Sequence, residues 1–218
     1  TIGTSEMTGK QKHPASPEWV VLKYGGTSVA AAGNWPMIAG VLRERQANGL
    51  RPVLVHSALA GVSDRLESLA RQPAADDRDA LVEQVADFHN RLVEELGLDP
   101  PQELVRLVEE MRRLAAGIAL TGEASPPLEA RLMALGELMA STIIVAYLRG
   151  QGFDVLAADA REVLRSRRVH SAHDPRRFLA AVCDSDRDTG LIDRWSGQPG
   201  VVVTQGFIAS DDRGRTVL

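Results

Sequence analysis

A solitary lysine beside two glycines is the part of this sequence with the clearest chemical meaning. The chain has 25 basic side chains, of which 22 are arginine and three are lysine, at Lys10, Lys12 and Lys23. A general bias towards arginine explains this excess, but it does not explain the lysine that stands two residues before Gly25 and Gly26. An ammonium is a compact point charge, and glycine lets backbone N–H groups approach an anion closely. These residues predict a phosphate-binding loop, for which a plain turn is the alternative.

The strands around this loop have to place it at the edge of a sheet. Four short apolar runs predict buried strands, at residues 19–23, 52–56, 153–158 and 201–208. The first two runs are each followed by a loop of small residues, at 24–28 and 57–61, and then by a helical pattern. Strands that alternate with helices predict an α/β fold, with a mostly parallel sheet covered by helices on both faces. Ligands bind beyond the carboxyl ends of such strands, so both loops are expected at the same edge.

Helical periodicity accounts for most of the remaining chain. Helices are expected at about residues 29–47, with a break or restart at 34–36, at 62–71, at 126–149 and, as a short helix, at 175–183. Two further patterns, at 81–96 and 104–114, predict an α-helical insertion at about residues 76–120 that carries little obvious chemistry. Residues 72–79 predict a surface connection, and Asp211–Gly214 predicts a hairpin turn.

Composition and charge argue against several classes of protein. The formal net charge of −4 and the sequence pI near 5.8 do not suit a nucleic-acid binder with a basic surface. No apolar run approaches the roughly 20 residues that span a bilayer, and the polar residues 1–18 predict a disordered leader or residues left from expression. The single cysteine, Cys183, excludes an internal disulfide and fits a reducing cytoplasm. His170, His173 and Asp174 have no further ligand cluster beside them, so no metal site is expected.

Four stretches, in this order along the chain, match short sequence motifs. Residues 23–29 (KYGGTSV) are similar to K-F-G-G-T-S-V, and residues 57–64 (SALAGVSD) are similar to the loop S-A-x-x-G-V-T-D. Residues 136–141 (GELMAS) are similar to the helix motif G-E-x-x-S, and residues 205–209 (QGFIA) are similar to the strand and turn Q-G-F-I-G/A. Together these stretches resemble the aspartate kinases of the amino acid kinase family. The resemblance implies a three-layer α/β/α sandwich. It also implies that ATP, with Mg²⁺, phosphorylates the β-carboxylate of L-aspartate on the way to lysine, threonine and methionine.

The same resemblance assigns the glycine loop to the phosphate. It implies that Lys23 is the catalytic residue, which neutralises the transferring phosphoryl group. Gly25 and Gly26 are implied to bind that phosphate through their backbone N–H groups, together with Thr27. These roles are physically coherent, because phosphoryl transfer depends on positioning and charge neutralisation more than on covalent chemistry.

Three residues further along the chain are implied to bind the amino-acid substrate. Glu137 matches the glutamate that holds the α-ammonium group, Ser63 matches a Thr or Ser that contacts the substrate, and Ser57 belongs to the same loop. Each has a structural alternative. A carboxylate in a mainly apolar helix could form a salt bridge with an arginine, and Ser63 could serve only as a helix cap.

The resemblance also sets the expected extent of the domain. Thr216–Leu218 reaches the edge of the family motif L-G-R-G-G-S-D, so residues 19–218 are expected to form the amino-terminal, substrate-binding lobe of the kinase domain. The chain is expected to be a fragment, inactive by itself, or one part of a longer and potentially bifunctional polypeptide. Its expected partners are L-aspartate and ATP, without nucleic acid or membrane. A homo-oligomer in the cytoplasm is expected.

Two other functions remain open at this point. The first is another amino acid kinase, acting on acetylglutamate or glutamate, against which Thr27-Ser28-Val29 after the glycines argues. The second is a non-catalytic regulatory or assembly module with the same fold. The presence of Lys23 and Glu137 in a chain dominated by arginine argues against the second.

Overall fold

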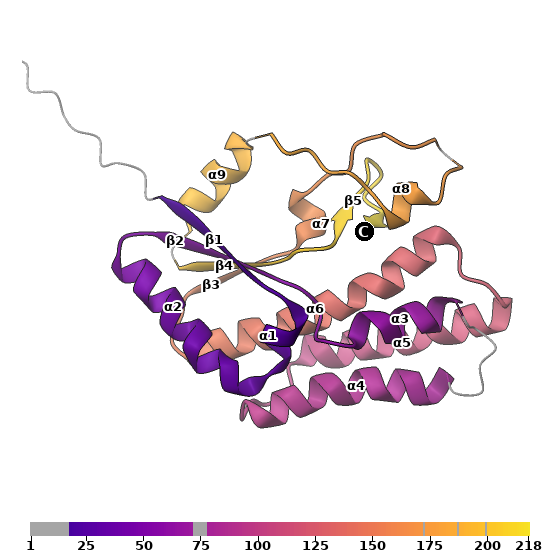
Figure 1. The fold of residues 1–218 in the computed structure, drawn as a ribbon, viewed down its shortest axis with the longest axis horizontal. Coiled ribbons are helices and arrows are strands. Elements are labelled where there is room, and N and C mark those ends of the chain that lie inside the picture. Colours follow the sequence, from indigo (N-terminus) through magenta and orange to yellow (C-terminus); the bar gives the residue numbers. More distant parts are fainter. Residues whose placement is uncertain (1–17, 72–77, 172, 187, 199) are drawn as a thin grey trace, which may run out of the picture.

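The computed structural model describes residues 18–71, 78–171, 173–186, 188–198 and 200–218 (Figure 1). The leader expected at residues 1–18 therefore lies outside the described residues, except for Glu18. The connection expected at residues 72–79 also lies outside them, except for its last two residues.

Four parallel strands form the main sheet, as the apolar runs predicted. They are β1 (Trp19–Tyr24), β2 (Arg51–His56), β3 (Val155–Ala158) and β4 (Val201–Gln205), in the spatial order β1-β2-β4-β3. Lys23 lies opposite Val55, which in turn lies opposite Thr204. The inner strands β2 and β4 are rich in valine and largely buried, as expected for strands with neighbours on both sides. The carboxyl ends of all four strands therefore meet at one edge.

Helices cover both faces of this sheet. They are α1 (Gly26–Ala30), α2 (Trp35–Ala47), α3 (Val62–Arg71), α4 (Arg78–Glu95), α5 (Gln102–Thr121), α6 (Pro126–Gly150), α7 (Ala160–Val163), α8 (Arg176–Leu179) and α9 (Thr189–Ser196). On one face α6 packs against β3 and β4, α2 packs against β2, and α3, α4 and α5 pack around α6 (Figure 1). On the other face Trp195 of α9 packs against Val53, Ala158 and Val202. The predicted α/β sandwich is confirmed.

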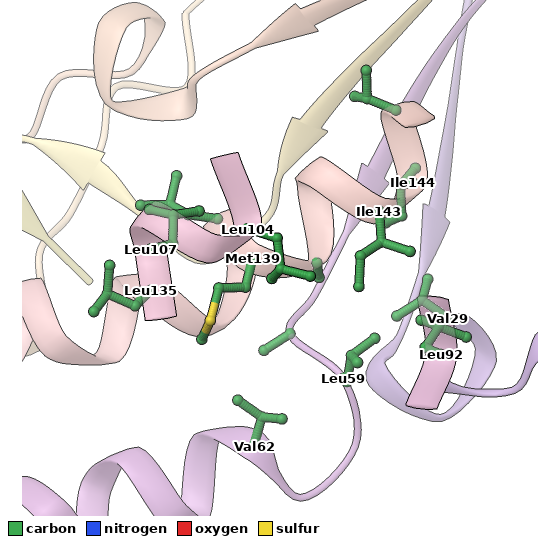
Figure 2. Close-up of a cluster of buried hydrophobic side chains, with 14 of the residues drawn as sticks. Val29, Leu59, Val62, Leu92, Leu104, Leu107, Leu135, Met139, Ile143 and Ile144 are labelled. Carbon is green, nitrogen blue, oxygen red and sulfur yellow. The ribbon is translucent and has the colours of Figure 1, made fainter. Parts of the chain in front are cut away.

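The main core lies between the sheet and the helices that surround α6. Figure 2 shows buried apolar side chains that α1, α3, α4, α5 and α6 direct towards one another. The core side chains of α4 and α5 belong to the same cluster as those of the sheet. Whether these two helices form an insertion at residues 76–120 stays a prediction.

The long helix α6 is the centre of this packing. Proline occupies its first turn, where the missing N–H costs nothing, and leucine, methionine and alanine with high helix propensity follow. Among the described residues, α6 is the one helix long and apolar enough to cross a membrane. Charged side chains such as Glu137 interrupt its apolar stretch, so the sequence contains no uninterrupted apolar run of that length. Of the most apolar window of α6, 72% is buried inside the fold, as in a core helix.

Several boundaries differ from the sequence predictions. The helix expected from about residue 29 begins at Gly26, is interrupted by a short 3₁₀ helix (Ala32–Asn34) and restarts at Trp35. The restart at 34–36 is confirmed, with Pro36 in the first turn of α2. The helix expected at 175–183 contains only Arg176–Leu179, and α7 and α9 were not predicted, because they are short and half-polar. The hairpin turn is confirmed: it joins β5 (Ala209–Ser210) to β6 (Thr216–Val217).

Candidate active site

The expected site residues gather at the carboxyl edge of the sheet, around the ends of β1, β2 and β4. Backbone hydrogen bonds continue past the strands and join the loops that follow them. Ser57 N–H donates to the carbonyl of Tyr24 at 3.2 Å, and Gly206 N–H donates to the carbonyl of His56 at 2.9 Å. The segments that follow β1, β2 and β4 are therefore held side by side, as the alternation of strands and helices predicted.

The two glycines of the first loop serve different purposes. A Cβ atom on Gly26 would lie 2.6 Å from the carbonyl oxygen of Ala58, a distance that real side chains do not tolerate. A Cβ atom on Gly25 would meet nothing within 4 Å, and Gly25 is exposed. Gly26 thus lets the first loop pack against the second, whereas Gly25 leaves an open approach to the backbone. The sequence predicted the same role, phosphate binding, for both glycines and did not separate the packed Gly26 from the open Gly25.

This difference gives a testable expectation for alanine substitutions at the two glycines. We expect Gly26→Ala to lower the free energy of unfolding by about 1–3 kcal/mol, as overpacking does. Gly25→Ala should change it by less than about 1 kcal/mol, because φ of Gly25 is −75° and the space around it is open. Thermal denaturation with and without ATP measures both effects. For Gly25→Ala, the stabilisation by ATP should be lost at unchanged basal stability; equal loss of basal stability in the two variants would contradict this assignment.

Lys23 is the penultimate residue of β1 and is exposed at the edge where the loops meet. Thr27, also exposed, lies in the first turn of α1 and not in a loop. Gly25 precedes this helix, and its carbonyl accepts the N–H groups of Ser28 and Val29 at 3.0 and 3.2 Å. A cation and the start of a helix therefore lie together at an open surface, an arrangement that favours an anion.

Glu137 is a buried carboxylate at the same edge, only 2% exposed. Its Oε2 accepts a hydrogen bond from the backbone N–H of Phe207 at 3.0 Å. Burial raises the pKa of the Glu137 carboxyl to about 7. The N–H groups of Phe207 and Gly206 and the charge of Lys23 lower that pKa, but less than burial raises it. No arginine forms an ion pair with Glu137 within the described part of the chain, so the structural salt bridge is not what holds it there.

Close packing brings the second loop against the helix that carries Glu137. Gly136 leaves no room for a side chain, because a Cβ atom would lie 3.0 Å from Val62 Cγ1 and 3.1 Å from Ala58 Cβ. The loop at 57–61 therefore contacts α6 directly beside Glu137. This contact explains why a glycine precedes the glutamate in the middle of a long helix, where glycine otherwise costs about 1 kcal/mol.

The two candidate serines lie on this loop and on the helix after it. Ser57 is half-buried, and its backbone is fixed by the hydrogen bond to Tyr24. Ser63 is exposed and follows Val62, the first residue of α3, so it lies inside the first helical turn and not at the cap. The alternative of a pure helix cap is therefore not favoured, and both serines stay candidates for contact with a substrate.

Sequence reasoning missed a hydrogen-bond network below these loops, in which the half-buried Ser141 joins the buried His56 and Gln205. Two of the three lie in the quoted motif stretches, yet no pattern along the chain shows that they meet. In the helix motif G-E-x-x-S the serine position is occupied here by Ala140, and the hydroxyl comes one residue later, at Ser141. The 64 and 85 residues that separate Ser141 from its partners hide the network from any local signal.

Metal-binding side chains do not gather in the described part of the chain, where no group of three or more His, Cys, Asp or Glu could hold an ion. His170 and Asp174 come within 3.9 Å of each other, but Asp174 also pairs with Arg176 at 2.7 Å. The donors at the sheet edge are an ammonium and backbone N–H groups, which suit phosphate oxygens and not a cation.

The chain is similar to several aspartokinases. It is 32% identical over 201 residues to lysine-sensitive aspartokinase 3 of Escherichia coli (strain K12), covering 91% of this chain and 42% of that protein. It is 26% identical to the aspartokinase of Chlamydia trachomatis, with the same coverage of both proteins. The crystal structure of E. coli aspartokinase III in complex with aspartate and ADP superposes with a TM-score of 0.75 at 29% identity, covering 92% of this chain and 43% of that chain.

The family is shown by a match that extends over nearly the whole chain. The chain spans less than half the length of the relatives it matches, so the similarity concerns only the matched part of each relative. The model of the amino acid kinase family matches residues 18–218, which include the sheet, the glycine loop and Glu137. This chain belongs to the amino acid kinase family.

Proposed function

We propose that this chain forms the amino-acid-binding part of an aspartate kinase, which transfers the γ-phosphoryl group of ATP to the β-carboxylate of L-aspartate. The observation that carries the proposal is Glu137. Its carboxylate is buried at the carboxyl edge of the sheet, has no arginine partner among the described residues, and lies within the electrostatic reach of Lys23. Burying a carboxylate in this way is costly unless a ligand compensates it.

The proposed division of labour follows from the charges. Ionised Glu137 binds the α-ammonium group of aspartate, and Ser57 and Ser63 lie on the neighbouring loop and helix, where they can contact the same substrate. The exposed ammonium of Lys23 attracts the transferring phosphoryl group, and the backbone at Gly25 and the start of α1, which contains Thr27, adds N–H donors. Preorganised donors of this kind stabilise the charge that develops during transfer.

Magnesium is proposed to enter as part of the ATP complex. Mg²⁺ keeps water and substrate phosphates among its ligands and needs few protein carboxylates. The edge of the sheet accordingly offers N–H and ammonium donors for phosphate oxygens, and no side chain of this chain is proposed as a ligand of the ion. The crystal structure of E. coli aspartokinase III is a complex with aspartate and ADP, which supports aspartate and ATP as the substrates of this chain. We also propose that the protein works in the cytoplasm and forms a homo-oligomer.

The direct test is an acceptor panel. We expect the full-length protein to form ADP with L-aspartate at a rate at least tenfold higher than with L-glutamate or N-acetylglutamate, measured in a coupled assay. Calorimetry should detect aspartate binding. Preference for either of the other acceptors would assign the chain to another amino acid kinase, and absence of both binding and turnover would favour a non-catalytic module.

A further inference from the structure

The network behind the site, buried at His56 and Gln205 and half-buried at Ser141, joins four elements through directed hydrogen bonds. His56 of β2 is fully buried, and its Nε2 lies 2.7 Å from the hydroxyl of Ser141 on α6. The side-chain N–H of Gln205 on β4 donates to the same hydroxyl oxygen at 2.5 Å, and Gln205 Oε1 accepts the backbone N–H of Ala160 at 2.8 Å. At the other end, His56 Nδ1 lies 3.0 Å from the carbonyl oxygen of Ser57.

Each hydrogen bond in this network has only one possible direction. A carbonyl oxygen only accepts, so His56 carries its proton on Nδ1 and donates it to Ser57. His56 Nε2 is then an acceptor, which requires the Ser141 hydroxyl to donate to it while the hydroxyl oxygen accepts from Gln205. Burial lowers the pKa of His56 to about 4, so the imidazole stays neutral and the arrangement persists at neutral pH. Fully satisfied buried networks of this kind are rigid.

The two ends of the network reach the two loops that border Glu137. Gln205 directly precedes Gly206 and Phe207, and Phe207 donates its N–H to the Glu137 carboxylate. His56 accepts the N–H of Gly206 through its own carbonyl and holds Ser57 through its ring. Ser141 lies one helical turn after Glu137 on α6, so the same helix carries both the carboxylate and the centre of the network.

We propose that His56, Ser141 and Gln205 are positioning residues of the amino-acid site, which hold the turn at 206–207 and the loop at Ser57 in register with Glu137. This inference rests on the proposed function, because it takes Glu137 to be the group that binds aspartate. The three side chains act through Glu137 and the turn and take no part in the transfer itself. Their hydroxyl, amide and imidazole groups fix the distance between the Glu137 carboxylate on α6, which accepts, and the Phe207 N–H after β4, which donates.

The test removes the centre of the network and compares it with a neighbouring hydroxyl. Ser141→Ala leaves His56 Nε2 and the Gln205 amide without their shared partner, so the turn relaxes and Phe207 N–H no longer holds Glu137. We expect the KM for aspartate to rise about tenfold in the full-length protein, with the KM for ATP unchanged. Ser141→Thr keeps the hydroxyl and should restore the wild-type KM. Thr142→Ala is the matched control, because that hydroxyl donates only to the Met139 carbonyl within α6.

A second readout does not depend on the enzyme being active. Loss of the Phe207 hydrogen bond removes a contact that lowers the pKa of Glu137, so this pKa should rise above about 7 in Ser141→Ala and stay unchanged in Thr142→Ala. Carbon-13 NMR of the labelled glutamate carboxyl groups, with Glu137→Gln to assign the signal, measures it directly. An unchanged Glu137 pKa in Ser141→Ala, or equal effects of Ser141→Ala and Thr142→Ala on KM, would overturn the proposal. If the wild-type protein neither binds nor phosphorylates aspartate, but Ser141→Ala still raises the Glu137 pKa, the proposed function is overturned and the positioning role stands.

Discussion

Replacing Lys23 by arginine is expected to lower kcat for aspartate phosphorylation by about 10²–10³-fold, the cost of losing one preorganised electrostatic contact in a transfer site. The substitution keeps the positive charge, but a planar guanidinium cannot take the place of a compact ammonium beside Gly25. Steady-state kinetics of aspartate-dependent ADP formation by the full-length protein measures the effect.

The fold should not suffer from this change. The Lys23 side chain is exposed at the end of β1, so the midpoint of thermal unfolding is expected to stay within a few degrees of the wild-type value. A kcat within tenfold of wild type would show that charge alone suffices at this position and that Lys23 is not the group that contacts the phosphoryl oxygens.

Replacing Glu137 by glutamine is expected to abolish measurable aspartate binding and to stabilise the empty protein above neutral pH. Glutamine keeps an acceptor for the Phe207 N–H but cannot pair with an ammonium group. Loss of a buried charge partner costs a ligand several kcal/mol, which corresponds to a rise in Kd of about 10²-fold or more. Isothermal calorimetry with aspartate measures the loss.

The stability gain has a defined pH window. The Glu137 pKa is about 7 in the folded protein, above its ordinary value of 4.5, so the unfolded chain releases this proton at a lower pH than the folded one. Wild-type stability therefore falls as the pH rises from about 4.5 to about 7 and then levels off, a loss on the order of 3 kcal/mol for such a shift. Glu137→Gln lacks this loss. The two proteins should unfold alike at pH 4 and differ most at pH 8, and a glutamine variant less stable than wild type at pH 8 would contradict the raised pKa.

The same ionisation links pH to substrate binding. Only the ionised carboxylate pairs with the α-ammonium group, so aspartate affinity should increase as the pH rises through about 7. Bound aspartate favours the ionised form and should move the midpoint of this transition to lower pH. A ligand-binding group that lowers the stability of the empty protein, as ionised Glu137 does, is common in functional sites.

The order of elements around the site could be predicted because it depends on local patterns. The apolar runs that became β1, β2 and β4 are too short and too rich in valine for other elements, and a helical pattern follows each of the loops at 24–28 and 57–61. Parallel strands connected in this way must end at one edge. The sequence alone therefore places Lys23, Gly25 and Ser57 together.

The residues with long-range roles could not be predicted in the same way. The structural need for Gly26 depends on the carbonyl of Ala58, which is 32 residues away along the chain and 2.6 Å from where a Cβ atom would be. The raised pKa of Glu137 depends on burial by several elements at once.

The sequence by itself determined the fold class, the family and the edge of the sheet where the chemistry lies, since periodicity and short motifs act over a few residues. Only the tertiary structure decided that Gly25 faces open space while Gly26 is packed, that Glu137 meets the N–H of Phe207, and that Ser141 lies between His56 and Gln205. The physical reason is distance along the chain. Steric exclusion, desolvation and directed hydrogen bonds arise between residues that become neighbours only when β2, β4 and α6 pack together.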